Sequence, residues 1–84
     1  MREFKAKSLT RLIEIKRQLL EKYPDKADRV NYLVDVIATK LENLRIFTLT
    51  DYIATLYHAS KEFAEFEQLI PSSKEVEELL KSSE

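Results

Sequence analysis

The only histidine of the chain lies near two glutamates at helical spacing. His58, Glu62 and Glu65 are four and seven residues apart, so a helix would place all three on one face. Imidazole and carboxylate groups are ligands for transition metals. However, the paired Glu-x-x-His motifs of di-iron helical bundles are absent, and a charge-rich helix commonly shows such a cluster on its solvated face. We therefore predict no metal site and no cofactor.

Groups for covalent catalysis are scarce. The chain has no cysteine to act as a nucleophile and no second histidine, and without glycine it cannot form a Gly-x-Ser-x-Gly elbow. The absence of glycine also excludes P-loops and dinucleotide-binding fingerprints. Glu75, Glu77 and Glu78 supply neighbouring carboxylates, but nothing indicates the concave, desolvated setting that acid–base catalysis uses. We predict that the protein is not an enzyme and has no small-molecule substrate.

The composition predicts an all-α domain. The 84 residues are 44% hydrophobic and 35% charged, which is typical of one small globular unit. There is no glycine where average usage predicts about six, and tight hairpin turns depend on glycine. The lack of cysteine excludes disulfide scaffolds and thiolate metal sites. We expect a single helical-bundle domain over residues 1–84.

Two prolines and one change of apolar phase divide the chain. Pro24 and Pro71 interrupt helices because proline lacks the N–H donor and biases the preceding residue toward extended geometry. A third break is expected near residues 47–50. The predicted helices cover residues 3–23, 25–46, 50–70 and 73–82. The expected N-terminal caps are Asp25, Thr48 with Asp51 or Thr50 alone, and Ser72 with Glu75.

The connections between the predicted helices are short, which favours antiparallel neighbours. We therefore predict a small up-down-up three-helix bundle, with a short fourth C-terminal helix that folds back over one end. The second helix carries the clearest apolar stripe, with steps of four, three, four and three, at Val30, Val34, Ile37, Leu41 and Leu44.

The third predicted helix has a wider apolar arc than one core needs. Ile53, Tyr57 and Ala64 extend this arc to nearly half of the helix circumference. The fourth helix is too short to be stable alone, and its apolar edge consists of Val76, Leu79 and Leu80. These six residues predict a non-catalytic accessory or adaptor subunit that binds a larger protein or self-associates. Tyr57 is the leading contact, because tyrosine is enriched at interface hot spots.

The charge distribution supports an alternative. Residues 1–45 carry eleven Lys or Arg against seven acids, whereas residues 46–84 carry three against eight. The basic side chains of the first helix could contact phosphates, in a protein that binds nucleic acid weakly or rides on replication, transcription or RNA-processing machinery. The opposing interpretation is that they pair with the acidic half, in line with the net charge of −1. The candidate contacts are Lys5, Lys7, Arg11, Arg17 and Lys22.

Three further features follow from the sequence. Residues 53–63 partly resemble a helix-turn-helix, but His58 replaces the turn glycine and Glu62 and Glu65 would repel phosphate, so we expect one continuous helix. No stretch has the length and apolarity of a membrane span or a signal peptide, so we expect no membrane association and an intracellular, cytoplasmic location. Few amides, one methionine and abundant Lys and Glu favour thermostability.

Overall fold

A computed structural model describes residues 2–66 and 70–82 of the chain. Within this part every regular element is helical and no strand occurs, so the all-α prediction is confirmed. None of the described helices is both long enough and apolar enough to span a bilayer. The elements are α1 (Arg2–Lys22), a 3-10 turn (Pro24–Lys26), α2 (Ala27–Glu42), α3 (Leu49–Glu62), a second 3-10 turn (Ala64–Phe66) and α4 (Ser73–Ser82).

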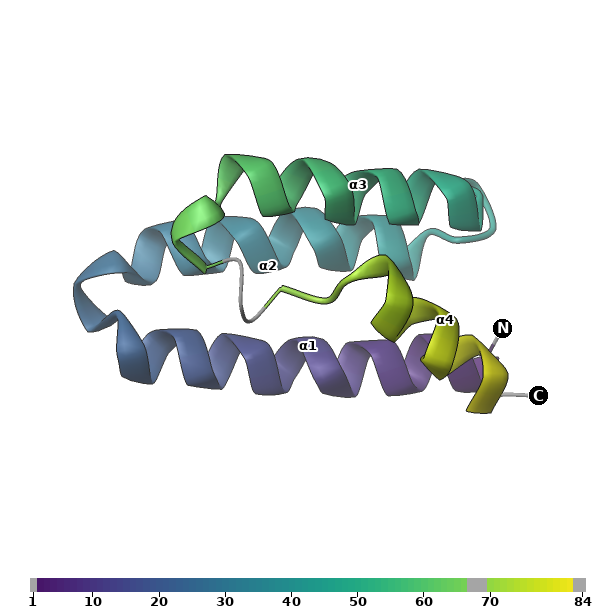
Figure 1. Cartoon of the computed structure of the whole chain (residues 1–84), viewed down its shortest axis with the longest axis horizontal. Helices are drawn as coiled ribbons and strands as arrows, with labels where there is room; N and C mark the ends of the chain where they lie inside the picture. The colour runs from purple at the N-terminus through teal and green to yellow at the C-terminus, as the bar shows by residue number, and fades with distance from the viewer. Residues whose placement is uncertain (1, 67–69, 83–84) are drawn as a thin grey trace.

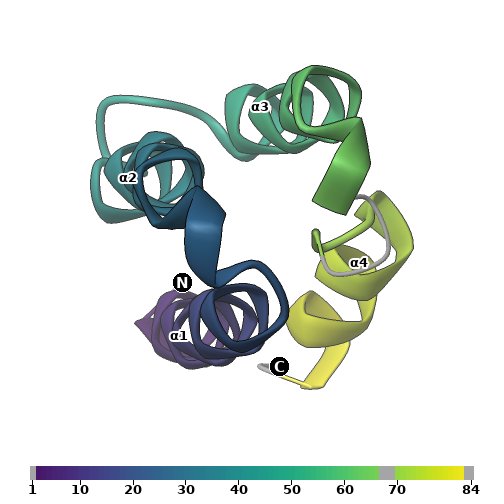
Figure 2. The same ribbon diagram turned by 90° about the vertical axis from the view of Figure 1, so that its left-hand side faces the viewer.

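The helices lie side by side, and consecutive helices run in opposite directions (Figure 1). Viewed from the end, they occupy four corners, with α2 and α4 each between α1 and α3 (Figure 2). The short α4 therefore packs alongside α1 and α3. The sequence had instead predicted that this helix folds back over one end of the bundle.

Each helix contributes one face to a common core. In α1 and α2 the buried positions recur at intervals of three and four residues, which keeps them on one side of a helix. Burial of one such large apolar side chain stabilises a fold by about 1.5–3 kcal/mol. The buried apolar residues are Phe4, Leu12, Ile15, Leu19, Val30, Leu33, Ile37, Leu41, Tyr52, Leu56, Ala59, Phe63, Phe66, Ile70 and Val76.

The second helix is shorter than predicted at both ends. Pro24 opens a 3-10 turn in which the Lys26 amide donates to the Tyr23 carbonyl (2.9 Å), so α2 begins only at Ala27. The prediction that Asp25 is the N-cap is therefore wrong, and Lys26 occupies that position without a side-chain cap. α2 ends at Glu42.

The third helix begins with the predicted capping box. The Asp51 amide donates to Thr48 Oγ1 (3.1 Å), and the Thr48 amide donates to Asp51 Oδ2 (3.0 Å). Hydrogen bonds with Thr48 lower the pKa of Asp51. The bond from the Thr48 amide has the largest effect, and the bond with the Thr48 side chain has the next largest. The second predicted box is only half formed. The Glu75 amide donates to Ser72 Oγ (3.2 Å), while the Glu75 carboxylate pairs with Arg11.

α3 continues without interruption through His58, as the continuous-helix prediction required, but it ends at Glu62 and not at residue 70. The chain then forms the 3-10 turn Ala64–Phe66, and residues 67–69 lie outside the described part. Donors from earlier in the chain bind the carbonyl oxygens released there. Arg29 Nη2 donates to the Glu62 carbonyl (3.0 Å), and Tyr23 Oη donates to the Glu65 carbonyl (3.1 Å).

Candidate functional site

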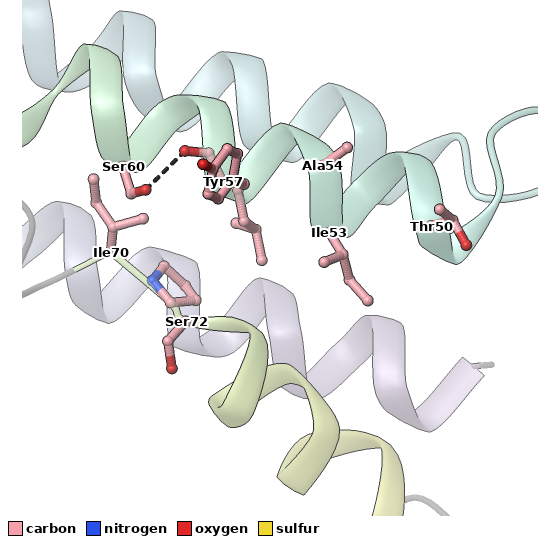
Figure 3. Close-up of a pocket in the computed structure, with 9 residues that line it drawn as sticks. Thr50, Ile53, Ala54, Tyr57, Ser60, Ile70 and Ser72 are labelled. Carbon is pink, nitrogen blue, oxygen red and sulfur yellow. Dashed lines mark hydrogen bonds between the residues drawn. The ribbon is translucent and has the colours of Figure 1, made fainter.

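A groove lies between α3 and the chain that leads into α4 (Figure 3). Its volume is about 480 Å³, and most of its lining is apolar. The α3 wall presents both small and large side chains, and a buried proline contributes to the opposite wall. The groove is lined by Thr50, Ile53, Ala54, Leu56, Tyr57, Ser60, Ile70, Pro71 and Ser72.

Tyr57 is the most prominent side chain at this groove. Its exposed fraction is 56%, although the side chain is large and aromatic. The ring meets the His58 ring edge-on with centroids 5.8 Å apart, and Lys61 Nζ lies 4.5 Å from the tyrosine ring centroid. An exposed tyrosine beside an apolar groove, with a cation over its ring, is typical of residues that dominate protein interfaces.

Tyr57 belongs to a row of four exposed residues on α3, which we call the outward stripe: Thr50, Ala54, Tyr57 and Lys61. Their spacing of four, three and four residues places them along one line of the helix. The buried residues of α3, Tyr52, Leu56 and Ala59, lie on the opposite face. The outward stripe is therefore not used by the core of its own domain.

The structure divides the six residues predicted to bind a partner. Ile53, which is half-buried, and Tyr57 both line the α3 groove. Ala64 is exposed but lies in the 3-10 turn after α3, because the helix ends two residues earlier, and it is not among the groove residues. Val76 is only 1% exposed and belongs to the core, so the prediction that it contacts a partner is corrected.

The remaining two residues, Leu79 and Leu80, are half-buried and pack against the core. Leu79 also lines a second groove of about 420 Å³ between α1 and α4, next to Ala6, Lys7 and Thr10. The apolar edge of α4 thus serves mainly to attach α4 to its own bundle. It does not extend the surface at Tyr57.

A polar contact accompanies the docking of α4. Arg11 of α1 forms an ion pair with Glu75 of α4, and each side chain keeps about a third of its surface exposed (32% and 30%). Tyr52 of α3 is 2% exposed, and its ring meets Phe4 edge-on at 6.1 Å. Burial, and then the negative charge of Glu75, raises the pKa of Tyr52 to about 12.

This shift predicts a loss of stability in alkali. The folded state favours the neutral form of the Tyr52 side chain. The stabilisation that results from this preference is complete below the ordinary tyrosine pKa of 10.0 and is lost as the pH rises to about 12. We expect the free energy of unfolding to fall by about 2–3 kcal/mol over this interval. Urea titrations across it should show a shallower decline for Tyr52→Phe. Equal declines in both proteins would contradict the assignment.

The cluster that resembled a metal site is engaged otherwise. Arg29 Nε donates to Glu65 Oε1 at 2.7 Å, and this bond lowers the pKa of Glu65. The His58 ring contacts Tyr57. Across residues 2–66 and 70–82, no three or more His, Cys, Asp or Glu side chains are grouped so that they could hold a metal ion.

The candidate phosphate-binding residues do not all lie on one surface, although Lys7 and Arg11 line the same groove. Lys5 lies on the side of α1 next to α2, Arg11 lies on the side next to α4, and Lys7 lines the groove between α1 and α4. Several of these residues bind acceptors within the chain. Lys5 Nζ donates to the Glu42 carbonyl (3.0 Å), Arg11 pairs with Glu75, Arg17 pairs with Glu14 (3.4 Å) and Glu21 (3.1 Å), and Lys22 Nζ lies 5.5 Å from the Tyr23 ring centroid.

Sequence reasoning missed part of the groove. Ala54 and Ser60 follow from helical spacing once Tyr57 is placed, because they lie three residues from it on the same side of α3. Ile70 and Pro71 carry no such signal, since their position depends on how the chain returns after α3.

In comparisons with protein-family models, curated proteins and solved structures, no match was found.

Proposed function

We propose that this protein is a non-catalytic helical interaction domain, an accessory or adaptor subunit, that binds another polypeptide through the outward stripe of α3 and the adjacent groove. The observation that carries this proposal is Tyr57, an exposed aromatic side chain beside an apolar groove of about 480 Å³. In this proposal, α3 is held at the surface by an up-down-up three-helix bundle.

Two further observations support this choice of surface. Core packing explains the positions of Val76, Leu79 and Leu80. Tyr57 and Ala54 are exposed and have no such explanation, and Ile53 is buried only in part. Interfaces commonly combine an aromatic anchor with a neighbouring pocket that a partner side chain fills.

The nucleic-acid alternative receives less support. Direct phosphate binding requires several free cations on one surface, but Arg11 and Arg17 form ion pairs and Lys5 binds a backbone carbonyl. A salt-titrated binding assay would test it. Direct contact requires affinity that falls steeply with salt, with a smaller slope after Lys7→Ala/Arg11→Ala.

Replacing Tyr57 with aspartate tests the proposed surface. We expect Tyr57→Asp bait to retain its native protein partner at least about 30-fold more weakly than the unchanged chain, as for a hot-spot residue worth about 2 kcal/mol. Ile13→Asp is the control, because Ile13 is 69% exposed and lies on α1, away from α3. The measurement is the affinity of the purified partner for each folded variant.

Circular dichroism first establishes that both variants are helical. If Tyr57→Asp binds like the unchanged chain, or if both substitutions weaken binding equally, α3 is not the recognition surface.

A further inference from the structure

The outward stripe combines features that fit a second copy of the same helix. We propose that two copies of this chain pair weakly through α3, with the helices antiparallel and Ala54 of each copy facing Tyr57 of the other. This inference rests on the proposed function, because it names the occupant of the same surface.

The first argument is complementarity of size. Ala54 and Tyr57 are neighbours on the outward stripe, and both are exposed. An antiparallel pair centred between them places each large tyrosine ring over a small alanine methyl group of the second copy, as in knob-into-hole packing. The adjacent groove, lined by Ile53 and Pro71, gives apolar surface on which the ring can rest. One helix thus supplies both halves of the contact, which a two-fold symmetric interface requires.

The second argument is complementarity of charge. Asp51 and Lys61 are exposed and lie near opposite ends of α3. The antiparallel register places Thr50 of one copy opposite Lys61 of the other, so that Asp51 lies next to that ammonium group. Hydrogen bonds with Thr48 lower the pKa of Asp51 and so favour its charged form. Opposite charges therefore meet at both ends of the pair.

A parallel arrangement lacks both features. It would place Tyr57 against Tyr57 and Ala54 against Ala54, so that large side chains meet at one level and a gap is left at another. It would also bring Asp51 near Asp51 and Lys61 near Lys61, and like charges at close range disfavour association. The antiparallel register is therefore the one that this sequence of side chains favours.

The pairing must be weak, because the surface is small. α3 has 14 residues, so it is about 21 Å long. One helix of this length, with the groove beside it, lies at the low end of interface sizes, where complexes are transient. We expect a dissociation constant on the order of 0.1–1 mM.

Paramagnetic relaxation tests both the pairing and its direction. The chain has no cysteine, so Thr50→Cys allows a nitroxide label to be attached at a single site. Nitroxide-labelled chain at natural isotope abundance is mixed with ¹⁵N-labelled chain that carries no nitroxide. The total concentration is about 1 mM, where a pair of the expected affinity is well populated. Only intermolecular contact can then broaden the amide signals.

We expect the strongest broadening around Lys61 and weaker broadening at Thr50. Adding Tyr57→Asp to both chains should abolish it. A label at Ile13→Cys, on an α1 residue that is 69% exposed, should not broaden α3 selectively.

Broadening centred on Thr50, broadening of another helix, or no broadening at all would overturn the proposed pair. If these results coincide with a Tyr57-dependent complex with a different protein, only the second-copy occupant fails. If Tyr57→Asp leaves that complex intact as well, the proposed function fails too.

Discussion

Val76→Asp is expected to lower the free energy of unfolding by about 3–5 kcal/mol, because it places an uncompensated carboxylate in the core. Val76 is 1% exposed, and Arg11, which lies next to α4, already pairs with Glu75. Such a loss is large relative to the 5–15 kcal/mol of a typical domain. Urea denaturation followed by circular dichroism measures it.

Glu77→Ala provides the control on the same helix, since Glu77 is exposed and its replacement should change stability by no more than about 0.5 kcal/mol. The experiment also separates two roles for Val76. A residue reserved for a partner would tolerate aspartate without loss of stability, and that result would show that α4 is not docked on its own bundle.

Phe63→Ala should cost about 3–5 kcal/mol, the range for removing a fully buried phenylalanine. Phe63 is 1% exposed and lies at the centre of an aromatic cluster. Its ring stacks on Phe66 with centroids 6.4 Å apart and meets Tyr32 at 5.9 Å, while the Arg29 guanidinium lies 4.5 Å from its centroid. The variant loses these contacts and leaves a cavity where α3 ends. Equilibrium unfolding in urea gives the value.

Phe63→Leu separates loss of volume from loss of the aromatic contacts. It keeps most of the apolar bulk, so we expect a smaller loss of about 1–2 kcal/mol. A loss below about 1 kcal/mol for Phe63→Ala would mean that this cluster does not determine the end of α3.

The helical class was predictable because its signals are local. The absence of glycine and the regular apolar spacing of the second helix depend only on neighbouring residues. Likewise, Thr48 and Asp51 are three residues apart, so their capping box could be read from the sequence. The start of α4 at Ser73 follows from Pro71 in the same way.

The end of α3 was not predictable, because it depends on distant residues. Phe66 and Ile70 continue the apolar phase of the helix, so the pattern alone extends it. Side chains of Arg29 and Tyr23 supply hydrogen bonds to the Glu62 and Glu65 carbonyls and make an early end acceptable. These partners are more than 30 residues away in the chain (|i−j| of 33 and 42).

The candidate site likewise contains one residue whose position was predictable from the sequence and one whose position was not. The exposure of Tyr57 follows from its angle on a single helix, which spacing determines. The role of Val76 depends on which helix α4 packs against, and helical periodicity carries no information about register between helices. Periodicity alone therefore identified an apolar edge on α4 but could not say what covers it.

The central claim is that α3 presents the surface by which this protein recognises a second copy of its own chain. Amide chemical shifts of the ¹⁵N-labelled protein, recorded from about 20 µM to about 1 mM, test it most directly, because weak pairing becomes populated in that range. The account predicts shift changes confined to residues 50–61 and 70–72. Changes that map to the exposed faces of α1 or α2, with α3 unaltered, would contradict it.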